Sequence, residues 1–275
     1  MSEIELEGKR VLIREDLNVP IRQGEIVNDA RLRAAIPSLL SALDAGAALI
    51  VMSHLGRPEE GTWNEADSMA PIAERLAELL GRDVLLSKDW RNAAPLPGDV
   101  VLLENVRFNQ GETANDEALA REYAELCDVF IMDAFGTAHR SQASTEGVAR
   151  YAAEACAGPL LHSELRSLEH LADAERPMLA VVGGSKVSTK LRVLDELSRK
   201  CDSLIVGGGI ANTFLAAAGY PVGRSLCEWN LVDTARRLMD KVPIPLPLDV
   251  VVAPSLDRAK EATVKLVAEV TEEDM

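Results

Sequence analysis

Arginine and histidine side chains recur in four short polar segments of the N-terminal half, and each segment follows a short apolar run. The segments are REDLNVP at 14–20, SHLGRP at 53–58, ENVRF at 104–108 and DAFGTAHR at 133–140. If the apolar runs are strands of an open parallel sheet, the segments meet at its carboxyl edge, where such sheets bind ligands. Arg31, at the start of the first predicted helix, belongs to the same layer. Converging guanidinium groups are typical of sites for phosphorylated or carboxylate anions.

The overall negative charge means that an anionic ligand could bind only at a local cluster of cations. The formal net charge is −15, which disfavours nucleic acid as a partner, because phosphate neutralisation needs Lys and Arg. An anionic ligand would be repelled by the protein as a whole, so concentrated cations must hold it. A single arginine is more often a solvated surface charge than a ligand-binding residue. Likewise, His54 or His139 alone is more often a structural histidine than a ligand-binding one. The inference therefore rests on five arginines that share one layer.

A second set of candidate residues lies in two glycine-rich turns. The sequence GGSKVSTK at 183–190 follows a predicted strand and opens a predicted helix, a place where free N–H groups favour an anion. Lys186 and Lys190 would lie on one face of that helix and reach the same phosphate chain. The spacing is not that of a Walker P-loop. The triple glycine at 207–209 indicates either a tight turn or a backbone that approaches a flat ligand such as a purine ring.

Strands alternate with helices along the chain, which predicts an α/β fold with a parallel sheet covered on both faces. The predicted N-terminal strands are 11–14, 47–52, 84–86, 100–103 and 129–132, with helices at 30–43, 68–80 and 115–126. A long helix at 159–172 precedes strands 178–182, 203–206 and 250–252 and helices 187–200, 211–218 and 231–241. We expect an N-terminal domain at 1–157, a connector at 158–176 and a partial second domain at 177–275.

The remaining composition indicates a soluble globular protein, with 47% hydrophobic and 27% charged residues. We expect no membrane association, because no apolar run reaches spanning length and the N-terminus has no signal-peptide core. The four cysteines form neither a CxxC pair nor a zinc pattern, which predicts reduced thiols in a cytoplasmic protein.

Taken together, the motifs resemble those of the phosphoglycerate kinase family over essentially the whole chain. They are, in order, RxDLNVP, DARLRA, SHLGRP, LLENVRF, DAFGTAHR, CAGPLL, VGGSKVSTK and VGGGIANTF. The resemblance implies two Rossmann-like domains that close about a hinge. It implies reversible phosphoryl transfer from 1,3-bisphosphoglycerate to ADP, giving 3-phosphoglycerate and ATP. It also implies a monomer, with Mg²⁺ brought by ADP or ATP as co-substrate and no tightly bound cofactor.

The resemblance also assigns residues. It places substrate-binding side chains at Asp16, Asn18, Arg31, His54, Arg57, Arg107 and Arg140. It gives catalytic roles to Arg31 and Lys186, which would meet the transferring phosphoryl group. Nucleotide contacts would come from Lys190, Gly207, Gly208 and Gly209, and no side chain present is expected to ligate a metal.

The chain departs from the family pattern at its C-terminal end. Family members continue past the position of Met275, and the later part holds a ribose-contacting glutamate and a magnesium-linked aspartate. We therefore expect a complete phosphoglycerate half and an incomplete nucleotide half, with negligible kinase activity from these 275 residues alone. The alternative function is a truncated, catalytically silent 3-phosphoglycerate-binding module. A scaffold with a decayed site is disfavoured, because every recognisable site residue is of the family type.

Overall fold

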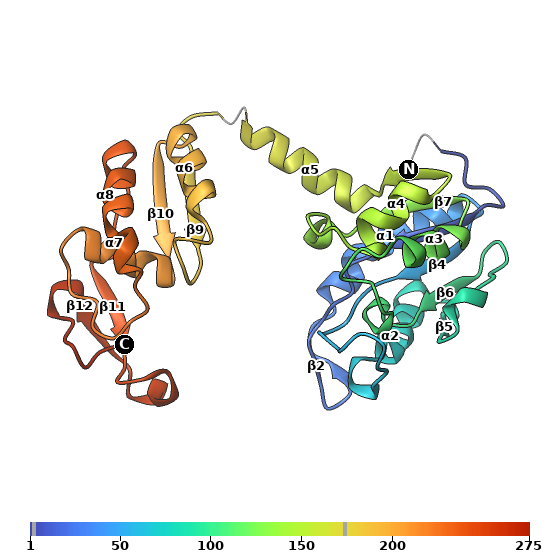
Figure 1. Cartoon of the computed structure of the whole chain (residues 1–275), viewed down its shortest axis with the longest axis horizontal. Helices are drawn as coiled ribbons and strands as arrows, with labels where there is room; N and C mark the ends of the chain where they lie inside the picture. Colours follow the sequence, from blue (N-terminus) through green and yellow to red (C-terminus); the bar gives the residue numbers. More distant parts are fainter. Residues whose placement is uncertain (2–3, 173–174) are drawn as a thin grey trace. The chain divides into compact units, whose positions relative to one another are not determined.

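The computed structural model describes Met1, residues 4–172 and residues 175–275. The chain divides into two compact units, Met1–Leu171 and Ala172–Met275 (Figure 1). Both units are α/β, as the sequence predicts. Within the described residues no helix is long and apolar enough to span a membrane. All four cysteines are free thiols.

The first unit is built on a six-stranded parallel sheet with the order β5-β6-β4-β1-β7-β8. Its strands are β1 (Arg10–Arg14), β4 (Ala48–Met52), β5 (Leu85–Ser87), β6 (Val100–Leu103), β7 (Val129–Met132) and β8 (Glu154–Ala157). The five predicted strands are confirmed. The sequence did not predict β8, because EACA lacks the β-branched and aromatic residues that favour strands. A small antiparallel hairpin, β2 (Ile21–Arg22) and β3 (Glu25–Ile26), follows β1.

Helices cover both faces of this sheet because successive strand side chains point to opposite sides. Val11 and Ile13 of β1 pack in one core with α1 (Ala30–Asp44) and α2 (Ala70–Leu80). Leu12, between them, packs in the other core with α3 (Glu117–Glu125) and α4 (Val148–Tyr151). The sheet is therefore buried on both faces, which is why its strands read as continuous apolar runs.

The long helix α5 (Pro159–Ala172) has the bounds that the sequence predicts. Its first turn is fixed to the sheet, because the Leu161 N–H donates to Asp133 Oδ1 over 2.9 Å. Gly158, just before it, lies so close to Asp133 that a Cβ there would be 2.3 Å from that carboxyl group. The junction between β8 and α5 therefore requires a glycine.

In the second unit, β9 (Leu179–Gly183) pairs in parallel with β10 (Ser203–Gly207). The helices are α6 (Leu191–Lys200), α7 (Gly209–Ala217) and α8 (Val232–Lys241), and they share one apolar core with these strands. A second sheet consists of β11 (Asp249–Val252) and β12 (Thr263–Leu266), which are antiparallel. The sequence did not predict β12. As expected of a partial sheet, β9 leaves apolar side chains exposed, Leu179 at 57% and Val181 at 69%.

Candidate functional site

The four polar segments meet at one edge of the first sheet. In the register of the sheet, Arg14 at the end of β1 lies opposite Met52 of β4 and Met132 of β7. On the far side of β4, Val51 lies opposite Leu102 of β6. The four strands therefore end at the same level, and the residues that follow them share the carboxyl edge. We call the basic residues of this edge the arginine cluster: Arg14, Arg31, His54, Arg57, Arg107 and Arg140.

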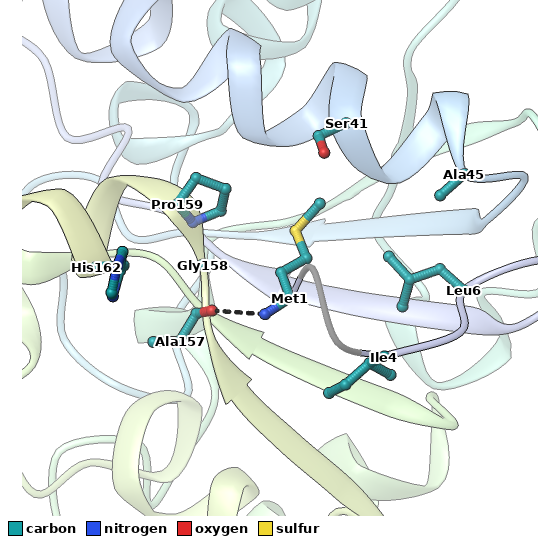
Figure 2. Close-up of a pocket in the computed structure, with 9 residues that line it drawn as sticks. All are labelled: Met1, Ile4, Leu6, Ser41, Ala45, Ala157, Gly158, Pro159 and His162. Atoms are coloured by element: carbon teal, nitrogen blue, oxygen red, sulfur yellow. Dashed lines mark hydrogen bonds between the residues drawn. The ribbon is translucent and has the colours of Figure 1, made fainter.

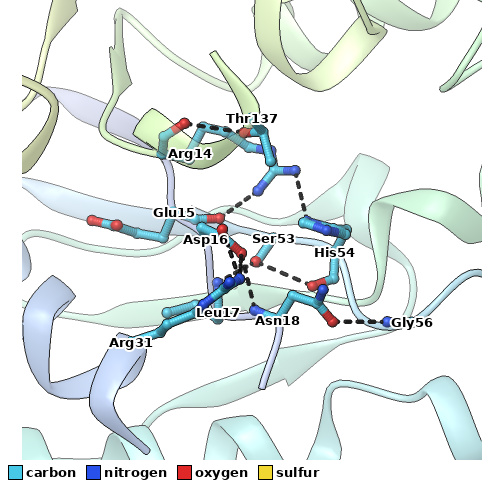
Figure 3. A network of polar contacts seen from close by, with 11 residues as sticks. Arg14, Glu15, Asp16, Leu17, Asn18, Arg31, Ser53, His54, Gly56 and Thr137 are labelled. Carbon is cyan, nitrogen blue, oxygen red and sulfur yellow. Dashed lines mark hydrogen bonds and ion pairs between the residues drawn. The ribbon is translucent and has the colours of Figure 1, made fainter. Parts of the chain in front are cut away.

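Arg31 enters the cluster from the first turn of α1. Its Nη1 donates to both carboxylate oxygens of Asp16 over 2.8 Å (Figure 3). The Arg31 side chain is 53% exposed, so the pair keeps contact with solvent. Asn18 folds over the same carboxylate by donating its backbone N–H to Asp16 Oδ1, and its own Oδ1 accepts from the Gly56 N–H over 3.1 Å. The first and second polar segments are thereby joined.

His54 is almost fully buried. Burial, followed in order of size by the positive charges of Arg14, Arg107, Arg140 and Arg31, lowers the pKa of His54 to about 2. The imidazole is therefore neutral at physiological pH. Four guanidinium groups from separate segments act on one histidine, which is the convergence that the sequence predicts.

Arg107 is held beneath the surface by backbone contacts. It lies in a short 3-10 turn, Val106–Phe108, and its Nη1 donates to the carbonyl of Gly56. Burial lowers the pKa of Arg107, and the charges of Arg140 and Arg57 lower it further. Arg57 itself is exposed and Arg140 half-buried. Across the part of the chain that the structure describes, Arg31 is the cluster member that forms a salt bridge, and the other members have no carboxylate within salt-bridge distance.

Asn105 organises the loops that carry these side chains. Its Oδ1 accepts from the N–H groups of Leu55 and Arg107, over 3.2 and 3.1 Å. Its Nδ2 donates to the carbonyls of Leu55 and Asp67, over 2.7 and 2.9 Å. One buried amide therefore fixes the second polar segment against the third.

The residues assigned by the family resemblance do not include Arg14, Asn105, Glu112 or Ser144, although Arg14 is one of the five arginines that the sequence places in one layer. Arg14 and Asn105 stand inside the recognised segments, and their position at strand ends was a usable signal. Glu112 and Ser144 lie outside the segments and reach the cluster only through the fold, since Ser144 and Arg14 are 130 residues apart. No local pattern marks them.

In the second unit the lysines do not lie as predicted. Helix α6 begins at Leu191, so Lys186 and Lys190 precede it and do not lie on one helix face. The reason is a contact with a distant residue: Glu228 accepts from both the N–H and the hydroxyl of Ser188, which holds this stretch as a turn. Both lysines are exposed.

The turn that contains Gly208 and Gly209 packs directly on the turn that contains Gly184 and Ser185, which leaves no room for side chains at the first two residues. Gly208 has φ +64°, and a Cβ there would lie 2.8 Å from the carbonyl oxygen of Gly184. A Cβ on Gly209 would lie 2.3 Å from the carbonyl oxygen of Ser185. Gly207 has nothing within 4 Å of such a Cβ.

Gly208 and Gly209 also line a cavity of about 560 Å³. Its other walls are mostly apolar and include Leu226, Val251 and Leu256. The structure thus supports the interpretation of the triple glycine as a tight turn, and it places two of these glycines beside a mostly apolar hollow.

Another hollow lies in the first unit, between the N-terminal segment, α1 and the start of α5 (Figure 2). Met1, Ile4 and Leu6 line it, and the amino group of Met1 donates to the carbonyl of Ala157 over 3.4 Å. No arginine or lysine of the described residues lines it, so it is separate from the arginine cluster. Among residues 1, 4–172 and 175–275, no group of three or more His, Cys, Asp and Glu side chains could hold a metal ion.

Comparison with known proteins gives a consistent result. The family model described as phosphoglycerate kinase matches residues 1–275. The structure of phosphoglycerate kinase from Coxiella burnetii has a TM-score of 0.84 and 51% identity, with 100% of this chain and 72% of that chain covered. Phosphoglycerate kinase from Pyrococcus horikoshii OT3 also has a TM-score of 0.84, with 27% identity and 99% and 72% covered. The chain therefore belongs to the phosphoglycerate kinase family.

Proposed function

We propose that the chain serves the phosphoglycerate kinase reaction, in which the carboxyl phosphate of 1,3-bisphosphoglycerate is transferred to ADP and 3-phosphoglycerate and ATP are formed. The observation that carries this proposal is the convergence of guanidinium groups from separate segments on the buried, neutral His54. Such a cluster, on an acidic protein, matches a small and highly charged phosphorylated acid.

We assign the phosphoglycerate to the first unit. Arg57, Arg107 and Arg140 would hold its phosphate and carboxylate, and each charge-assisted hydrogen bond contributes about 1.5–3 kcal/mol. His54 adds a neutral N–H donor, while Asp16 and Asn18 order the loop around the bound acid. Because these cations repel one another in the free protein, the anion relieves that repulsion when it binds.

Arg31 and Lys186 are proposed to act on the transferring phosphoryl group. Little covalent chemistry is needed, because an acyl phosphate is a reactive donor and catalysis consists of in-line positioning and charge stabilisation. Arg31 suits this role because Asp16 holds it at the solvent side of the cluster. The exposed ammonium group of Lys186 would neutralise charge from the nucleotide side.

The nucleotide is assigned to the second unit. The cavity beside Gly208 and Gly209 would receive the adenine ring, the backbone at Gly207 would border it, and Lys190 would hold phosphates. Mg²⁺ belongs to the nucleotide co-substrate.

We further propose that the chain divides into an N-terminal domain at 1–157, a hinge at 158–176 and a second, partial domain at 177–275. We also propose that the protein is monomeric and cytoplasmic.

A second candidate is a silent 3-phosphoglycerate-binding module. It is favoured by the arginine cluster, which is assembled within one unit, and by a chain that spans 72% of the Coxiella burnetii chain. An assay of ATP formation from 1,3-bisphosphoglycerate and ADP, run beside calorimetry with 3-phosphoglycerate, separates the two. We expect these 275 residues to bind 3-phosphoglycerate and to form ATP very slowly. Rapid ATP formation that Lys186→Ala abolishes would exclude the silent module, and a chain without 3-phosphoglycerate binding would contradict both candidates.

A further inference from the structure

Beneath the arginine cluster, a buried chain of polar side chains connects Glu112 to His54. Its members are Glu112, Ser144, Arg14 and His54, with exposures of 1%, 0%, 1% and 4%. Only His54 is among the residues that the family resemblance assigns to the site, and Arg14 is one of the five arginines of the sequence-predicted layer. Desolvated polar groups of this kind persist where their hydrogen bonds are satisfied, so the contacts along the chain define what it can do.

Each hydrogen bond in this series has a defined donor and acceptor. The backbone N–H of Ser144 donates to Glu112 Oε2 over 3.0 Å, and its hydroxyl donates to Glu112 Oε1. That hydroxyl oxygen accepts from Arg14 Nε over 3.1 Å. Both oxygens of Glu112 are thus used as acceptors, as in an ionised carboxylate. Glu112 also supplies negative charge near Arg14, whose guanidinium is fully buried.

The last contact in this series of hydrogen bonds, between Arg14 and His54, fixes the tautomer of His54. Arg14 Nη2 lies 3.3 Å from His54 Nδ1, and a guanidinium can only donate, so Nδ1 must be the acceptor (Figure 3). The single imidazole hydrogen is then on Nε2. Among the described residues the imidazole makes its one side-chain hydrogen bond through Nδ1, and Nε2 has no partner. It is therefore free to donate to a ligand.

A neutral donor suits this position better than an imidazolium would. Arg107, Arg140 and Arg31 already surround His54, and a further positive charge would be repelled by them. A neutral Nε2–H still offers a directed hydrogen bond to an anionic oxygen. The position of that hydrogen depends on Arg14. The Arg14 guanidinium is held by the Ser144 hydroxyl, which Glu112 binds, and by the backbone carbonyl of Glu15.

We propose that Glu112, acting through Ser144 and Arg14, is a positioning residue that holds neutral His54 with its Nε2–H available to the bound phosphoglycerate. The ligand in this statement rests on the proposed function. The tautomer itself does not, because it follows from contacts within the protein.

The test uses the full chain labelled with ¹⁵N-histidine, which contains four histidines. Two-bond ¹H–¹⁵N correlation spectra, recorded from pH 5 to 8 without ligand, report which ring nitrogen of His54 carries the hydrogen. Calorimetry then gives the Kd for 3-phosphoglycerate. The variants are Ser144→Ala and Glu112→Gln. Ser141→Ala is the matched control, because it lies in the same segment and its side chain is exposed.

The wild type is expected to show the Nε2–H tautomer at every pH. Ser144→Ala and Glu112→Gln should give mixed or titrating His54 signals and a Kd raised about tenfold, the size of one lost charge-assisted hydrogen bond. Ser141→Ala should match the wild type. The proposal is overturned if wild-type His54 carries its hydrogen on Nδ1 or titrates between pH 5 and 8. This part of the test needs only the wild type, so it stands even if a variant fails to fold. It is also overturned if both folded variants keep the wild-type spectrum and Kd. A chain with the expected tautomers that does not bind 3-phosphoglycerate would support the positioning of His54 and contradict the proposed function.

Discussion

At the residue scale, two buried carboxyl groups lie together at the ends of β1 and β7. Glu15 is 1% exposed and Asp133 is 0% exposed. Neither oxygen of Glu15 has a hydrogen-bond partner among the described residues, and Asp133 Oδ2 has none. Burial raises the pKa of Glu15 well above its usual value, and the adjacent Asp133 raises it further. A protonated Glu15 would donate to Asp133, which in turn anchors the first turn of α5.

This pair predicts how stability changes with pH. A raised folded-state pKa stabilises the protein fully below the unfolded value of 4.5, and that stabilisation is lost as the pH rises through the folded pKa. The amide introduced by Glu15→Gln does not titrate, so the variant does not lose stability in this way. The difference between its free energy of unfolding and that of the wild type should therefore rise with pH above 4.5, by up to about 1.4 kcal/mol per pH unit. Urea unfolding between pH 4 and 8 measures this. The exposed Glu74→Gln on α2 is the control, and a flat difference for Glu15→Gln would contradict the paired-carboxyl account.

Arg140 predicts opposite effects on binding and on stability. Its side chain crowds other cations and forms no salt bridge within the described residues, so it adds repulsion to the free protein. Arg140→Gln should weaken 3-phosphoglycerate binding about tenfold or more. The Tm without ligand should stay the same or rise. Thermal unfolding and calorimetry check both parts, with Arg82→Gln as an exposed control outside the cluster; a lower Tm with unchanged binding would argue for a structural role.

At the element scale, the arginine cluster depends on how strand-end loops are joined. Asn105 makes hydrogen bonds to Leu55, Arg107 and Asp67. Asn105→Ala leaves buried backbone groups without partners, and we expect a loss of about 2–4 kcal/mol in the free energy of unfolding. Denaturant unfolding measures the loss. Asn92→Ala, at an exposed amide, serves as the control, and a loss below 1 kcal/mol would show that the loops hold each other without this side chain.

The glycine turns of the second unit give a matched pair of substitutions. A Cβ at Gly209 would lie 2.3 Å from the carbonyl oxygen of Ser185, whereas a Cβ at Gly207 meets nothing within 4 Å. Gly209→Ala should therefore destabilise the second unit strongly, and Gly207→Ala should have little effect. Hydrogen exchange of the amides of β9 and β10 resolves the effect within that unit. Similar protection in both variants would contradict the packing of one turn on the other.

The elements that the sequence predicts well share a physical cause. Strands β4, β6 and β7 are apolar runs buried on both faces, and α5 is a continuous amphipathic stretch. Prediction failed where a distant contact decides the structure. Glu228, 40 residues away, holds Ser188 and delays the start of α6. Strand β12 is mostly exposed and owes its conformation to pairing with β11.

At the scale of the whole molecule, an acidic chain with a net charge of −15 gathers cations at one edge of one sheet. The segments that carry these cations were predicted because parallel strands end together. Their supporting residues, Glu112 and Ser144, were not, because only the tertiary fold brings them beneath Arg14. Local patterns could therefore identify the groups that would meet the ligand, while the groups that position them required the structure.

The most direct test of this account is calorimetric titration of the chain with 3-phosphoglycerate, using wild type and two double variants. Arg57→Gln with Arg140→Gln removes two cations from the cluster, and Arg33→Gln with Arg82→Gln removes two cations outside it. The account predicts saturable binding to wild type, near-wild-type binding to the second double variant, and a Kd raised at least 100-fold in the first. Equal weakening in both double variants, or no binding to wild type, would contradict a phosphoglycerate site at the arginine cluster.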